Sequence, residues 1–96
     1  MSQLDKLHRM RSGIYRIARK HHVRKVYVFG SCARQEETPE SDIDILIEPT
    51  AEATLFDFMD IQDELEKLLG RKIDVVSKRG LHPYLREDVL KEAVTL

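Results

Sequence analysis

Three aspartates have the type and the spacing to bind a metal ion. Asp42 and Asp44 lie in the strand-like segment 42–47, and Asp74 interrupts a second apolar run around residues 73–76. Strand periodicity turns Asp42 and Asp44 to one face, with Cα atoms about 6.5 Å apart. Carboxylates this close repel each other unless a cation lies between them, and their hard oxygens suit Mg²⁺. If Asp74 reaches the same face, the three acids can hold two metal ions roughly 3.5–4 Å apart.

A glycine–serine turn supplies a second candidate site. Gly30 and Ser31 directly follow the apolar run 23–29. Glycine lets the backbone approach a ligand closely, and the N–H groups that open a helical turn suit a phosphate. The Ser31 hydroxyl adds a donor, and Arg34, one turn later, can face the same anion. We therefore predict that Gly30, Ser31 and Arg34 bind phosphate.

Each of these pieces also has an ordinary structural interpretation. Gly-Ser is a common turn, and an Asp-x-Asp pair often marks the exposed edge of a strand. Asp74 could be the salt-bridge partner of Arg71 or Lys72. The order of the pieces is more specific than any one of them. The chain contains neither the Gly-Lys-Ser/Thr of a P-loop nor a G-x-G-x-x-G turn.

The elements that must position these residues follow from the apolar spacing. The pattern predicts helix, strand, short helical turn, strand, helix, strand and helix, in that order. Thr54 and Gly70 are the expected caps of the helix between the last two strands. A short link favours an antiparallel first pair of strands, and a helical crossover favours a parallel second pair. We expect an α/β (α+β) fold with a small mixed β-sheet of three or more strands flanked by helices. The segments are 3–20, 23–29, 30–34, 42–47, 54–70, 72–77 and a last helix that Pro83 opens and that includes Ala93 and Val94.

Length and composition indicate one small domain over residues 1–96. No apolar run approaches the roughly 18 residues that span a bilayer, and a single cysteine, Cys32, suits a reducing compartment, so we expect a cytoplasmic protein without a membrane segment. The net charge of −1 hides an asymmetry, because residues 1–25 carry eight Lys/Arg and one acid. This basic segment is either a solvated helix or a surface that meets phosphates or an acidic partner.

The motifs Gly30–Arg34 and Ser41–Glu48, with the strand Lys72–Val76 and the closing helix, resemble those of the polymerase-β-like nucleotidyltransferases. The resemblance is strongest to the minimal nucleotidyltransferases of prokaryotes, and it implies the nucleotidyltransferase fold. It implies that Gly30 and Ser31 hold a nucleoside triphosphate, and that Asp42 and Asp44 bind both metal ions. Asp74 would complete the metal site and help to deprotonate an acceptor hydroxyl, which attacks the α-phosphorus and releases pyrophosphate.

The same resemblance implies a partner. Stand-alone proteins of this kind are commonly antitoxins paired with a HEPN-type ribonuclease toxin, in a hetero-oligomer. The implied reaction uses two Mg²⁺ ions and transfers AMP from ATP to a tyrosine hydroxyl of the toxin. Exposed apolar side chains on the first or last helix are a candidate partner surface. Two alternatives remain: an antitoxin that acts by occlusion without catalysis, and a transferase acting on RNA or a small molecule, which keeps nucleic acid among the candidate partners.

Overall fold

A computed structural model describes residues 3–34, 42–80 and 83–96, apart from the side chains of Ser31 and residues 83–86. The predicted loop 35–41, which includes Ser41 of the second motif, lies outside the described residues. None of the helices in the described ranges has the length and hydropathy to cross a bilayer. The elements are α1 (Gln3–Arg9), α2 (Arg11–Lys20), β1 (Val23–Phe29), α3 (Gly30–Ala33), β2 (Ile43–Pro49), α4 (Leu55–Leu69), β3 (Ile73–Ser77), the 3₁₀ turn η1 (Lys78–Gly80), α5 (Pro83–Glu92) and β4 (Val94–Thr95).

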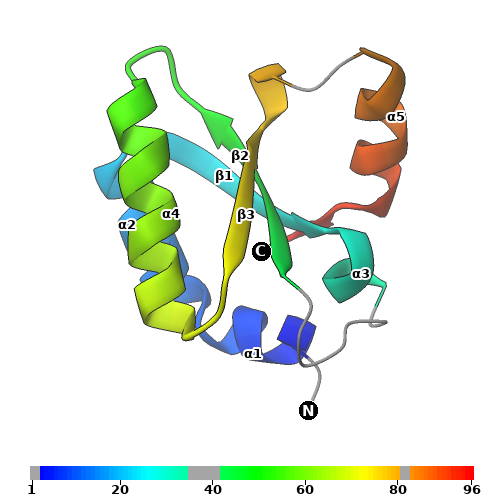
Figure 1. Ribbon diagram of the computed structural model, residues 1–96, viewed down its shortest axis with the longest axis horizontal. Helices are drawn as coiled ribbons and strands as arrows, with labels where there is room; N and C mark the ends of the chain where they lie inside the picture. The colour runs from blue at the N-terminus through cyan, green and yellow to red at the C-terminus, as the bar shows by residue number, and fades with distance from the viewer. Residues whose placement is uncertain (1–2, 35–41, 81–82) are drawn as a thin grey trace.

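The strands form one mixed sheet in the order β3-β2-β1-β4 (Figure 1). β1 and β2 are antiparallel, and β2 and β3 are parallel with α4 as the crossover, so both predicted pairings are confirmed. The predicted fold class is confirmed as well. β2 lies between β1 and β3 and therefore carries the residues at the centre of the sheet.

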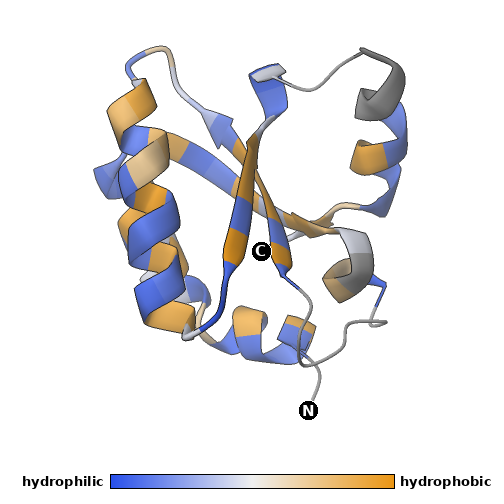
Figure 2. Cartoon of the chain, viewed as in Figure 1, coloured by the Kyte–Doolittle hydropathy of each residue, from blue (hydrophilic) through white to orange (hydrophobic). Residues whose placement is uncertain are grey.

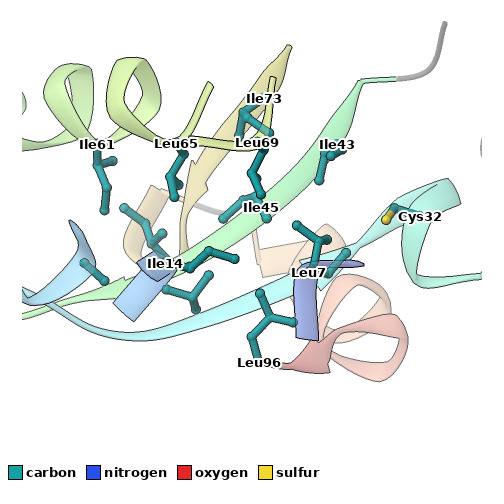
Figure 3. Close-up of a cluster of buried hydrophobic side chains, with 14 of the residues drawn as sticks. Leu7, Ile14, Cys32, Ile43, Ile45, Ile61, Leu65, Leu69, Ile73 and Leu96 are labelled. Carbon is teal, nitrogen blue, oxygen red and sulfur yellow. The ribbon is translucent and has the colours of Figure 1, made fainter. Parts of the chain in front are cut away.

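The main hydrophobic core lies between the sheet and the helices α2 and α4. Ile43, Ile45 and Ile47 project from one face of β2 and are almost completely buried. Figure 3 shows Ile61 and Leu65 of α4 pointing into this core. Burying an aliphatic side chain of this size contributes about 1.5–3 kcal/mol relative to leaving it exposed. The alternation that buries these isoleucines turns Asp44 to the opposite face, where α3 and α5 pack together.

The ends of α4 are fixed by the two predicted caps. The Thr54 side chain accepts a hydrogen bond from the backbone N–H of Asp57, and the Asp57 carboxylate accepts one from the N–H of Thr54. At the other end, Gly70 adopts the left-handed conformation, with φ 66°. Since Gly70 is followed closely by β3, this C-cap helps to set the position at which Asp74 enters the sheet.

The prediction of one continuous helix over residues 3–20 is wrong, because the chain breaks at Met10 (φ −93°, ψ 11°). The break lets α1 bury Leu4 and Leu7 across the end of the sheet while α2 runs beside α4 (Figure 1). A methyl group at Gly13 would lie 3.3 Å from Leu68 Cδ2 of α4, so glycine permits the close approach of these two helices. Gly13 also weakens the helix just after the break.

The strand β4 was not predicted, because the last helix was expected to include Ala93 and Val94. The helix instead ends at Glu92, and Val94 pairs with Val28 at the edge of the sheet. The backbone N–H of Leu96 donates to the carbonyl of Val26 at 3.0 Å. A two-residue strand is too short to show the alternation by which strands are recognised, and its formation depends on the distant β1.

Candidate active site

Three of the predicted residues meet at one end of the sheet. Asp44 is paired with Phe29 of β1 on one side and with Asp74 of β3 on the other. Gly30 directly follows Phe29, and Asp42 directly precedes β2. The register therefore brings Asp44, Asp74 and Gly30 together at the end of the sheet where α3 lies (Figure 1).

Asp42 and Asp74 lie close enough to Asp44 for their negative charges to disfavour the charged form of Asp44. Burial raises the pKa of Asp44 above its ordinary value, and the negative charges of Asp74 and Asp42 raise it further. The guanidinium of Arg34 opposes this effect but does not cancel it. Asp42 and Asp74 are exposed, whereas Asp44 is half-buried. The arrangement concentrates negative charge around Asp44, and a cation bound there would relieve the repulsion.

Gly30 is required here for two reasons. Its φ of +71° lies in the left-handed region, which residues with a side chain rarely adopt. A Cβ atom at this position would lie 2.3 Å from Oδ2 of Asp44, which is a severe clash. In the structure the group that lies close to Gly30 is the Asp44 carboxylate, and the approach of this glycine to a phosphate stays a prediction. Ser31 lies in α3, but its side chain is outside the described part of the structure.

Arg34, at the C-cap of α3, has a partner that the sequence did not reveal. Its Nη1 atom lies 2.9 Å from Oε2 of Glu92, at the end of α5. Lys72, which was considered as a salt-bridge partner of Asp74, lies near Asp42 instead, with its Nζ atom 4.0 Å from Oδ2 of Asp42. Arg34 and Glu92 are 58 positions apart in the chain, so no local sequence pattern predicts their contact. It ties the predicted phosphate-binding turn to the last helix.

The donor set fits a hard divalent cation. Carboxylate oxygens are the ligands that Mg²⁺ prefers, and the charges of Asp42 and Asp74 both act on Asp44. No group of three His, Cys, Asp or Glu side chains in the described ranges is already gathered closely enough to hold an ion. Mutual repulsion favours spread carboxylates, and Asp42 and Asp74 are exposed and can change rotamer. Asp42, Asp44 and Asp74 are therefore the residues that would hold the metal.

Sequence comparison relates most of this chain to known proteins. Residues 13–96 match the family described as polymerase beta, nucleotidyltransferase. The chain is also 43% identical, over 75 residues, to MJ0435 of Methanocaldococcus jannaschii, a protein assigned as a protein adenylyltransferase. That alignment covers 78% of this chain and 81% of MJ0435.

Two solved structures extend the comparison. One, assigned to the minimal nucleotidyltransferases, superimposes with a TM-score of 0.89 at 42% identity, covering all of this chain and 97% of the other. A second is the complex of a tri-AMPylated HEPN toxin from Shewanella oneidensis with an MNT antitoxin; its TM-score is 0.67 at 21% identity, over 99% of this chain and 71% of that one. At this lower identity the second structure shows a shared fold.

Proposed function

This chain belongs to the polymerase β nucleotidyltransferase family, and on that premise we propose that it is a Mg²⁺-dependent protein adenylyltransferase that transfers AMP from ATP to a tyrosine hydroxyl of a HEPN-type toxin. It would act as the antitoxin of that toxin, in a hetero-oligomer. The observation that carries the proposal is the meeting of Asp44, Asp74 and Gly30 at one end of the sheet.

The proposed reaction is an in-line displacement at the α-phosphorus of ATP. A bond forms between the acceptor oxygen and phosphorus, the bond to the bridging oxygen breaks, and pyrophosphate leaves. Bound Mg²⁺ would neutralise charge on the attacking and leaving oxygens. Asp42 and Asp44 would hold the metal ions, and Asp74 would complete their coordination and take the acceptor proton. Gly30 and Ser31 would hold the triphosphate, with Arg34 beside them.

The burial of Asp44 supports its place at the centre of this reaction. A half-buried carboxylate with a raised pKa is poorly placed to be a structural ion-pair partner, and it gains most from a cation. Preorganised charge of this kind is often the largest single contribution to catalysis. The exposed carboxylates of Asp42 and Asp74 leave the site open to a large acceptor such as a protein side chain.

An antitoxin that acts by binding alone is the second candidate, and a surface far from the acids favours it. Leu55 and Phe56 are each 77% exposed and Met59 is 68% exposed, on the first turns of α4. Figure 2 shows hydrophobic colouring at this end of the helix. The first helix, which was a candidate partner surface, instead buries Leu4 and Leu7. An apolar surface of this kind is typical of protein contacts, and its use is compatible with catalysis.

Intact-mass measurement distinguishes the candidates. The protein is incubated with ATP, Mg²⁺ and the purified toxin encoded by the neighbouring reading frame. The adenylyltransferase proposal requires the toxin to gain the mass of one or more AMP groups, and requires the gain to disappear in Asp42→Asn/Asp44→Asn. The matched control is Asp88→Asn, which removes an exposed acid of α5. A stable complex without a mass gain supports occlusion, and labelling of RNA but not of protein supports an RNA acceptor.

A further inference from the structure

A hollow lined by cations lies between α2 and the start of β1, which run side by side (Figure 1). Its volume is about 620 Å³, and β4 borders it at Thr95. No carboxylate is among the described residues that line it. We define the basic groove by the six other lining residues, which are Arg11, Ser12, Tyr15, Arg19, Arg24 and Lys25.

The cations of the basic groove are not neutralised by the fold. Within the described ranges, Arg11, Arg19 and Lys25 have no carboxylate oxygen within 4.0 Å of their charged nitrogens. Nε of Arg24 only just reaches Oε2 of Glu48, at 4.0 Å. Four like charges around one hollow repel one another, and an anion placed among them would relieve that repulsion.

Other basic residues of the same segment are used by the fold, which makes the basic groove distinct. Lys6 donates to the carbonyl of Leu69 at 3.3 Å and joins α1 to the end of α4. Nζ of Lys20 lies 2.9 Å from Oε1 of Glu64. The positive charge of residues 1–25 is therefore divided between cations that hold helices together and cations that face an open hollow.

From this chemistry we infer that the basic groove binds single-stranded nucleic acid. Three of its four cations are arginines, whose planar guanidinium groups match phosphate oxygens in pairs. The guanidinium of Arg11 lies over the Tyr15 ring, 5.6 Å from its centre, so one face of this cation is fixed and the other can stack on a base. A concave hollow accepts one strand, whereas a duplex is read by elements that protrude into its grooves.

The basic groove is separate from the candidate active site and does not depend on the proposed function. Lys25 and Phe29 are four positions apart on β1, which is about 13 Å, and Phe29 is the residue paired with Asp44. The two cations that β1 contributes to the basic groove, Arg24 and Lys25, thus lie near the start of the strand, whereas Asp44 is paired with its last residue. A strand bound in the basic groove would therefore be held away from the carboxylates that would repel its phosphates.

Fluorescence anisotropy with labelled single-stranded RNA and DNA oligonucleotides tests the inference. For four phosphate contacts, the logarithm of the binding constant falls with the logarithm of the salt concentration with a slope of about −3. In Arg19→Gln/Lys25→Gln the magnitude of the slope should fall by about half, while the melting temperature and toxin modification are unchanged. Binding of RNA, of DNA or of both supports the inference, and the ratio of the two affinities shows which nucleic acid the basic groove prefers.

The matched control is Arg9→Gln/Arg16→Gln, which removes the same charge from the same segment outside the basic groove. It should keep most of the affinity and of the salt dependence. Equal losses in the two double variants would assign binding to overall charge and overturn the inference. It would also be overturned if neither oligonucleotide binds, or if an acidic peptide such as polyglutamate binds in their place.

Discussion

Two acidic regions of this small protein are built in opposite ways. On α4, Asp57 and Glu64 lie on either side of His21, with Nδ1 of His21 3.3 Å from Oδ1 of Asp57 and Nε2 in contact with Oε2 of Glu64. Nζ of Lys20 lies 2.9 Å from Oε1 of the same Glu64 side chain. At the end of the sheet, Asp44 is instead surrounded by other acids and by burial.

The two regions differ in the direction of their pKa shifts. A hydrogen bond from the backbone N–H of Thr54 and, to a smaller extent, one from His21 hold the pKa of Asp57 below its ordinary value. Hydrogen bonds from Lys20 and His21 lower the pKa of Glu64 in the same way. Burial and neighbouring acids raise the pKa of Asp44. Asp57 and Glu64 of α4 thus stabilise the fold in their charged form, whereas the charged form of Asp44 destabilises it in the absence of a bound cation. A raised pKa in a group of acids is a signature of a functional site, and a lowered one is compatible with a structural role.

The largest effect is expected for Asp44→Asn. This substitution removes the charge and keeps the volume, so toxin modification should fall by at least about 100-fold. Without metal, the variant should melt at a higher temperature than the natural protein, because the repulsion with Asp74 and Asp42 is gone. Activity assays and thermal unfolding measure the two effects, and Asp88→Asn should show neither. An active variant would remove Asp44 from the catalytic site.

Gly30→Ala, compared with Gly70→Ala, separates backbone strain from contact with the acids. Both glycines have a positive φ, so backbone strain alone costs each alanine variant about 1–2 kcal/mol of unfolding free energy. Nothing lies within 4 Å of a Cβ added at Gly70, whereas at Gly30 it meets Asp44. Only Gly30→Ala should therefore abolish transfer. Equal activity in the two folded variants would mean that the close approach at Gly30 has no part in the reaction.

His21→Ala should affect stability and spare activity. His21 is buried and contacts Asp57 and Glu64, so its loss removes two interactions that join the end of α2 to α4, at a cost of about 0.5–1.5 kcal/mol for each hydrogen bond. The neighbouring His22 is exposed and lies 3.7 Å from Glu52, so His22→Ala should change stability much less. Chemical denaturation measures both. A loss of AMP transfer in a folded His21→Ala protein would mean that the acidic region of α4 also contributes to the activity.

The smallest effects are in the pH dependence of stability without metal. The pKa of Glu64 is lowered, so its contribution is present above its ordinary value of 4.5 and is lost as the pH falls through the folded-state pKa. The cost of Glu64→Gln should therefore shrink in acid. The pKa of Asp44 is raised, so the advantage of Asp44→Asn should grow as the pH rises through it. Denaturation of the two variants from pH 3 to pH 7 should give trends of these opposite signs.

Local patterns in the sequence predicted most of the fold. Alternation in β2 and the caps at Thr54 and Gly70 are local, and together with the crossover rule they correctly predicted that β2 and β3 are parallel neighbours. The break at Met10 depends instead on how α1 and α2 pack against other elements, and β4 depends on its pairing with β1.

The candidate site was predictable to the same extent. The topology places Asp44 beside Asp74, which the sequence pattern anticipated. The contact of Gly30 with the Asp44 carboxylate and the pair formed by Arg34 and Glu92 were not predictable, because each depends on side chains that only the folded chain brings together. Contacts of this kind produce no periodic pattern in a single sequence from which they could be predicted.

Thermal unfolding with and without Mg²⁺ and a non-hydrolysable ATP analogue measures whether the charge of Asp44 is needed to bind the metal–nucleotide complex. Without ligand, Asp44→Asn should melt above the natural protein. With both ligands the order should be reversed, because only the natural protein has the charge at Asp44 to bind the metal–nucleotide complex, and binding to the folded state alone raises its melting temperature. An equal gain in the two proteins would show that the complex binds without the charge of Asp44, and a variant that already melts lower without ligand would show that this charge does not destabilise the fold.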